Sequence, residues 1–240
     1  MRVAIVSDIH GNLTALEAVI DDLANTSPDV VLHGGDLADG GSNPVGVVDR
    51  IRELGWQGVG GNTDELLYRP ESLDEFAQGV PPERRSIFII LQEMARWTRE
   101  LLGDERLEWL RCLPISQNRD EFSLVHASPD SRWRAPGPGA TDAQLETTYS
   151  SLDSPTVIYG HIHEPYVRHM RGLTIANCGS VGLPYDNDPR ASYLLLDHGR
   201  PSICRVEYNI AAEINALRKS GLPHAEWVAH MLQTATMQMP

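Results

Sequence analysis

The sequence predicts an α/β fold, and three observations support that prediction. Short runs of apolar, mostly β-branched residues alternate with segments in which apolar residues recur every three or four positions. In residues 3–60 these segments follow the order strand, helix, strand, helix, strand, which is typical of a parallel sheet with right-handed crossovers. Later in the chain, short strands separated by turn residues indicate an antiparallel part.

The first five elements have clear start and stop signals. The first helix ends before Pro28, because proline donates no backbone hydrogen bond and restricts the residue before it. Asn43 as N-cap and Pro44 as first residue begin the second helix, which ends at Gly55. In order, the elements are a strand at residues 3–6, a helix from residue 13, a strand at 30–32, a helix at 44–54 and a strand at 56–60.

The rest of the chain shows no repeat and no linker that would separate two domains. We expect a single domain over residues 1–240, with a core at about residues 1–209 and a helical extension at about 210–240. Helices are expected at about residues 82–102, at 104–113 and, as a pair, in the last thirty residues. Strands are expected at residues 122–125, 156–159, 166–170, 173–176, 192–196 and 202–207.

The net charge of −13 argues against several classes of partner. Twenty Lys and Arg residues stand against 33 Asp and Glu residues, so the chain lacks the basic surface of a protein that binds long nucleic acid or an anionic membrane. No stretch approaches the roughly 18 apolar residues of a membrane span. The three cysteines are odd in number and lack zinc-site spacing, which indicates reduced thiols in a cytoplasmic protein.

Side chains that can bind a metal follow five strands at the point where each strand ends. Ligands of open α/β sheets bind at the carboxyl ends of the strands. Nitrogen and oxygen donors without thiolate suit two borderline divalent ions, such as Mn, Fe, Zn, Ni or Co, better than a structural zinc. Residues two apart on an extended segment point the same way, so each D-x-H or H-x-H pair is expected to converge on one site. The candidates are Asp8 and His10, Asp36, Asn62, His126, and His161 and His163.

Each candidate alone has a simpler explanation. A lone histidine at a strand end is usually a polar residue with satisfied hydrogen bonds, and an aspartate before a helix is usually a cap. Gly58 to Gly61 follow a strand and could begin a dinucleotide-binding loop, but the third glycine of that motif is missing. The coincidence of five such clusters favours a metal site.

These motifs resemble, in their order, those of the calcineurin-like metallophosphoesterase superfamily, and specifically its compact bacterial branch. That superfamily is marked by DxH, GDxxD, GNH followed by an acid, a lone His and GHxH. The compact branch adds SDIHGNL and an NPGSVG-like loop, which stand here at residues 7–13 and 177–182. The superfamily motifs stand here as Asp8 and His10, Gly35 with Asp36 and Asp39, Gly61 with Asn62, Thr63 and Asp64, His126, and Gly160 with His161 and His163.

The resemblance implies a four-layer α/β/β/α sandwich of two mixed sheets flanked by helices. It implies two divalent metal ions, with Mn the first choice. It also places Asn12, Gly179 and Ser180 near the pocket as candidate substrate contacts. One ion would be held by Asp8, His10 and His163, the other by Asn62, His126 and His161, and Asp36 would bridge them.

The activity that the resemblance implies is hydrolysis of a phosphoester by in-line attack of a hydroxide that bridges the two ions. Thr63 stands where much of the superfamily has a histidine thought to protonate the leaving oxygen. Threonine cannot do this at neutral pH, so the sequence favours phosphodiesters, the substrates of some compact relatives that also lack this histidine. The expected substrate is small and phosphorylated, because the acidic chain would repel long nucleic acid.

Two other functions stay open at this point. The same site could serve a phosphomonoesterase or a dinucleoside polyphosphate hydrolase. A catalytically weak protein-binding scaffold is the other alternative, since a retromer subunit of the superfamily uses this fold for protein contact. The last helices, with Leu217, Trp227, Val228 and Met231 as apolar positions, could pack on the domain or form a homo-oligomer.

Overall fold

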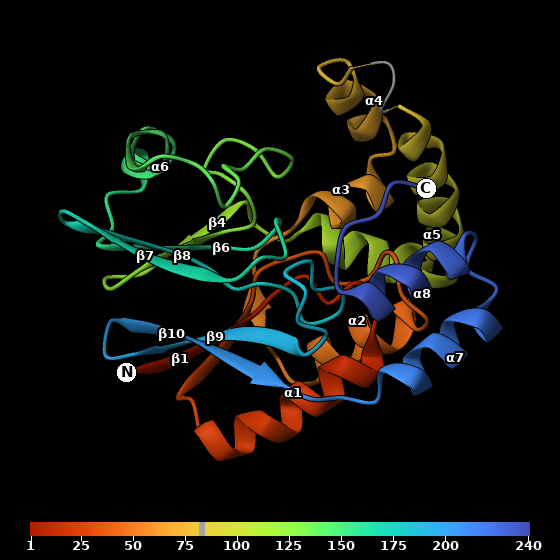
Figure 1. The fold of residues 1–240 in the computed structure, drawn as a ribbon, viewed down its shortest axis with the longest axis horizontal. Helices are drawn as coiled ribbons and strands as arrows, with labels where there is room; N and C mark the ends of the chain where they lie inside the picture. Colours follow the sequence, from red (N-terminus) through yellow and green to blue (C-terminus); the bar gives the residue numbers. More distant parts are fainter. Residues whose placement is uncertain (82–84) are drawn as a thin grey trace.

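Two five-stranded sheets face each other in the fold, as Figure 1 shows. The structure is a computed structural model, and it describes residues 1–81 and 85–240. The first sheet has the order β10 (Arg200–Val206), β9 (Ala191–Asp197), β1 (Arg2–Val6), β2 (Val30–His33) and β3 (Gln57–Gly58). The second has the order β4 (Ser116–Asn118), β5 (Ser123–Val125), β6 (Thr156–Tyr159), β8 (Leu173–Asn177) and β7 (Tyr166–Met170).

Both sheets are mixed, which confirms the predicted fold class. Strands β1, β2 and β3 are parallel, with Val3 opposite Val30, whereas β9 and β10 are antiparallel to their neighbours. Strands β5, β6 and β8 are parallel, and the edge strands β4 and β7 run antiparallel to them. The carboxyl ends of the parallel strands therefore share an edge within each sheet.

Helices cover the outer faces of both sheets. The alternation of side chains along β1 sends Val3 and Ile5 into the core between the sheets, and Ala4 and Val6 into the core beneath the helices. The result is four layers, with α6 outside the second sheet and α1 outside the first (Figure 1). The helices are α1 (Leu13–Thr26), α2 (Pro44–Glu53), α3 (Asn62–Tyr68), α4 (Glu71–Ala77), α5 (Ser86–Arg111), α6 (Asp142–Tyr149), α7 (Ile210–Ser220) and α8 (Ala225–Thr234), with a short 3-10 turn at Ser150–Leu152.

The middle of the chain agrees with the prediction in part. The element α5 consists of two helical segments separated at Gly103, whose φ of 66° and ψ of 171° are not helical, which confirms the break expected between the helices at residues 82–102 and 104–113. The expected start at Pro82 lies outside the described residues. Helices α3, α4 and α6 and strand β4 were not predicted, because each is too short for apolar periodicity to reveal it.

The two C-terminal helices pack onto the rest of the chain. Leu217 of α7 and Val228 and Met231 of α8 are buried against Met94 of α5 and Leu183. The sequence had identified Leu217, Val228 and Met231 as apolar positions, and residues of the same chain bury all three. Among the described helices, none is long and apolar enough to cross a membrane.

Truncation of Leu217 tests this packing. Leu217 is 0% exposed, so Leu217→Ala should lower the free energy of unfolding by about 2–5 kcal/mol, as cavity-forming changes do. Ile89→Ala, at a side chain that is 60% exposed, is the control and should change it by less than about 0.5 kcal/mol. Equal denaturant midpoints for the two variants would contradict the assigned packing.

Candidate metal centre

The candidate ligands lie on loops that leave the carboxyl ends of five strands. Asp8 and His10 follow β1, and Asp36 follows β2. Asn62 is the first residue of α3, just after β3, and His126 follows β5. His161 and His163 follow β6. Both sheets thus contribute ligands, and the structure brings all seven side chains together.

The backbone at five of these residues has a left-handed conformation. Its φ values are 55° at Asp8, 49° at His10, 53° at Asp36, 68° at His161 and 58° at His163. Such conformations are costly for residues other than glycine and cluster at functional sites. They also show that these segments are not extended. The prediction that the two side chains of each D-x-H or H-x-H pair point the same way assumed an extended backbone, and that assumption is wrong.

The first group of ligands contains Asp8, His10 and His163. The two Nε2 atoms of His10 and His163 are 3.1 Å apart, and His163 Nε2 lies 3.2 Å from Asp8 Oδ1. Potential ligand atoms of these three residues all lie within 4.8 Å of one another. The three side chains can therefore surround one ion.

The second group contains Asn62, His126 and His161. Asn62 Oδ1 lies 3.0 Å from His126 Nε2 and 2.8 Å from His161 Nδ1. His161 and His163 thus lie in different groups, and their imidazoles do not converge on one site.

Asp36 lies between the two groups. One carboxylate oxygen, Oδ1, is 3.5 Å from His126 Nε2, and the other, Oδ2, is 3.7 Å from His10 Nε2. Its side chain can therefore reach both sets of ligands, which is the position that a bridging carboxylate needs.

Backbone carbonyls fix the tautomers of three histidines. The Nδ1 atoms of His10, His126 and His163 lie 2.7, 2.8 and 2.5 Å from the carbonyl oxygens of Asp39, Gly34 and Leu183. Carbonyl oxygens only accept, so Nδ1 carries the proton and Nε2 of a neutral ring presents a lone pair. The facing lone pairs of His10 and His163 repel each other unless a cation lies between them, so the donor set fits a metal ion.

Further buried groups hold the carboxylates in place. Asp64 accepts hydrogen bonds from the backbone N–H groups of Asp36, Leu37 and Gly61, at 2.8, 2.9 and 3.0 Å. A β-carbon on Gly61 would collide with the Asp36 carboxylate, and one on Gly160 would collide with the Asp8 carboxylate. These two glycines are needed for the close approach of backbone to ligand.

The electrostatics of the site favour ionised carboxylates. Burial raises the pKa of Asp36, but His126 and His10 outweigh it and hold that pKa far below its usual range. Burial and His163 lower the pKa of His10. Burial also lowers the pKa of His126, but the nearby Asp36 carboxylate outweighs this effect, and the pKa of His126 rises to about 9. A divalent ion would take the place of this proton as the counter-charge, so metal binding competes with protonation of His126.

The three predicted substrate contacts lie behind the ligands. Asn12 caps α1 by accepting from Ala15 N–H and donates to the carbonyl of Gly182. The Ser180 hydroxyl donates to the Asp8 carbonyl at 2.6 Å, and Gly179 follows the buried β8. None of the three lines the cavity beside the ligands. Their position indicates that they support the Asp8 loop.

A cavity of about 190 Å³ opens beside His10, Asp36 and His163. Thr63 lines it, and the Thr63 hydroxyl is buried without a hydrogen-bond partner among the described residues. Asp39 also lines it, and burial raises the pKa of Asp39 to about 7 although the Thr98 hydroxyl donates to it.

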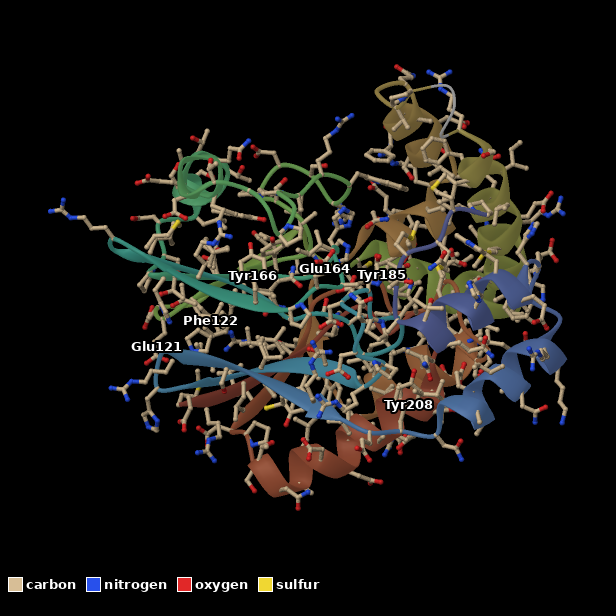
Figure 2. The ribbon with its side chains drawn as sticks, viewed as in Figure 1. Glu121, Phe122, Glu164, Tyr166, Tyr185 and Tyr208 are labelled. Carbon is tan, nitrogen blue, oxygen red and sulfur yellow. The ribbon has the colours of Figure 1, made fainter. Side chains whose placement is uncertain are left out.

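Sequence reasoning missed part of the cavity wall. Tyr185 lines it, and its ring stacks on His163 with centroids 4.4 Å apart. Figure 2 shows Tyr185 between the strand-end loops and α8. The other missed residues are Gly40 and Leu183, which lie on loops, and apolar residues of α5, α8 and the chain after α8. Their apolar spacing predicts buried helix faces but carries no signal of what those faces border.

Comparisons with known proteins place this site in context. The family model described as the calcineurin-like phosphoesterase superfamily domain matches residues 1–200. A crystal structure of a metallophosphoesterase from Sphaerobacter thermophilus is 30% identical, with a TM-score of 0.80, and the match covers 98% of this chain and 99% of that one.

Two curated proteins extend the comparison. An uncharacterized protein of Methanocaldococcus jannaschii is 31% identical over 96% of both chains. A symmetrical bis(5'-nucleosyl)-tetraphosphatase of Pectobacterium carotovorum is 27% identical over 72% of this chain and 60% of its own length.

The steric role of Gly61 generates a test of the site. Gly61→Ala removes no ligand, yet its β-carbon would displace the Asp36 carboxylate. We expect metal affinity to fall by about 10- to 100-fold, as it does when groups that orient ligands are changed. The control is Gly139→Ala, where a β-carbon would meet nothing within 4 Å. Equal metal content of the two dialysed variants, measured by elemental analysis, would contradict this role of Gly61.

Proposed function

Because the chain belongs to the calcineurin-like phosphoesterase superfamily, we propose that it is a metal-dependent hydrolase of a small phosphodiester. The observation that carries the proposal is the convergence of two carboxylates, one amide oxygen and four imidazoles beside a single cavity. A protein-binding scaffold would not need lone pairs held face to face, as those of His10 and His163 are.

The proposal includes two divalent ions, with Mn the first choice and Fe, Zn, Ni or Co as alternatives. When bound, the ions would supply positive charge for the phosphate and activate water as the nucleophile. We assign Asp36 as the ligand shared by both ions, because its two carboxylate oxygens face different groups. One ion would be held by Asp8, His10 and His163, and the other by Asn62, His126 and His161.

The charge balance supports an anionic substrate despite the acidity of the chain. Two ions would bring about four positive charges to ligands that include only two carboxylates, so the local potential would be opposite in sign to the net charge of −13. The surrounding acidic surface would still disfavour a long polyanion. A small phosphorylated molecule satisfies both conditions.

Thr63 is the basis for preferring diesters with good leaving groups. Its backbone N–H donates to Asp36 Oδ1 at 2.9 Å. Its hydroxyl, which has no hydrogen-bond partner in residues 1–81 and 85–240, is a weak acid that cannot supply a proton as a histidine can. A dinucleoside polyphosphate is the second candidate substrate, because the Pectobacterium carotovorum relative is named a symmetrical bis(5'-nucleosyl)-tetraphosphatase.

Turnover of an activated diester tests the proposed activity. Protein loaded with Mn, Fe, Zn, Ni or Co should hydrolyse bis(p-nitrophenyl) phosphate, and His126→Ala should lower kcat/KM by at least about a hundredfold through loss of a ligand. The control is His198→Ala, whose imidazole is exposed on the turn after β9. Absence of turnover with every metal, although two ions are bound per chain, would refute the activity.

A second prediction concerns the missing acid. Thr63→His should accelerate hydrolysis of diesters with alkyl leaving groups by about a hundredfold or more, and should change p-nitrophenyl esters much less, because only poor leaving groups need protonation. Steady-state kinetics on the two substrate types measure the difference. An unchanged rate for alkyl esters would show that another group supplies the proton, and Asp39 is the candidate that lines the cavity.

A further inference from the structure

The cavity beside the ligands has an apolar wall with no part in the chemistry described so far. Ile87, Leu91 and Met94 of α5 face it, and so do Trp227 and Met231 of α8. Met94 and Met231 are 3% and 1% exposed, so the wall is continuous with the core formed by α5, α7 and α8. This apolar surface lines the same cavity as His10, Asp36 and His163, so the organic part of a phosphoester bound at the ligands would contact it.

The chain after α8 completes this wall. It turns back toward α3 and α5, as Figure 1 shows, and places Met237 on the cavity. Trp227 Nε1 donates to the Gln238 carbonyl at 3.1 Å, and Asn187 N–H donates to the Ala235 carbonyl at 2.9 Å. These two hydrogen bonds hold the segment in place. All of these residues except Asn187 lie beyond residue 200, where the match to the family model ends.

The lining has no positive charge that could pair with additional phosphates. Its described residues include the carboxylates of Asp36 and Asp39 and no lysine or arginine. A polyphosphate chain would extend several negative charges beyond the metal ligands and find no counter-charge on this wall. A single phosphoester group would meet only the ligands.

The size of the cavity also limits the substrate. Its volume of about 190 Å³ is below the roughly 300–1,000 Å³ of sites that enclose drug-sized ligands. Tyr185, which is stacked against His163, occupies part of the lining. The space suits an aromatic ring or a short alkyl chain beside the phosphate.

We propose that the wall formed by α5, α8 and Met237 selects phosphoesters whose organic group is small and apolar, and disfavours dinucleoside polyphosphates. This inference rests on the proposed function and adds the substrate class. An apolar pocket distinguishes two substrates that differ by one methylene group by about 10- to 200-fold in kcat/KM. Met237 is the best residue to change, because it is 47% exposed and the fold does not depend on its burial.

The first test compares p-nitrophenyl phosphodiesters that share one leaving group and differ in the second ester group. For metal-loaded protein, kcat/KM should be at least about tenfold higher for the phenyl ester than for the methyl ester. It should also exceed that for bis(5'-adenosyl) tetraphosphate. Met237→Arg should reduce the phenyl preference, whereas Met239→Arg should retain it, since Met239 lies on the same segment outside the cavity lining. Equal kcat/KM values for the methyl and phenyl esters, or a higher kcat/KM for bis(5'-adenosyl) tetraphosphate, would overturn the proposal.

The second test does not depend on turnover. Calorimetric titration of metal-loaded protein with phenylphosphonate and methylphosphonate should give a Kd at least about tenfold lower for phenylphosphonate, and Met237→Arg should narrow that ratio. Equal Kd values would overturn the proposal. Tighter phenylphosphonate binding without hydrolysis of any ester would instead contradict the proposed function and leave the apolar selectivity supported.

Discussion

Two carboxylates buried where the loops of both sheets meet impose the main constraint on this fold. Asp8 and Asp36 are 0% and 2% exposed, and burying an unpaired charge costs several kcal/mol. The imidazoles of His126 and His163, on loops of the second sheet, face these two carboxylates from the first sheet, and a divalent ion would supply more counter-charge than a proton does. An ion bound at this edge would therefore also join the two sheets.

That constraint explains the irregular backbone around it. Left-handed conformations at residues such as His161 cost about 1–3 kcal/mol each and persist only where the surroundings enforce them. The Asp64 carboxylate helps to hold this backbone by accepting hydrogen bonds from three backbone N–H groups. Gly61 contributes because its missing side chain leaves room for the Asp36 carboxylate. The apolar wall formed by α5, α8 and Met237 then lines the other side of the cavity.

The sequence was informative wherever a local pattern decides the structure. The apolar run of β1 and the cap at Asn43 predicted their elements, and residue type at strand ends identified the seven side chains that lie together. Gly103 also predicted a local feature correctly, because its non-helical backbone separates the two helical segments of α5. The split of His161 from His163 depends on a reversed backbone, and the position of Met237 on the cavity depends on packing between distant segments, so neither has a local signal.

The central claim is that the converging ligands hold two ions with Asp36 between them. Anomalous diffraction from crystals of the Mn-loaded protein, recorded near the Mn absorption edge, tests it directly. We predict two peaks, one beside the Nε2 atoms of His10 and His163 and one beside Asn62 and His126, each next to a different oxygen of Asp36. A single peak that does not contact Asp36, or no peak among these side chains, would contradict the account.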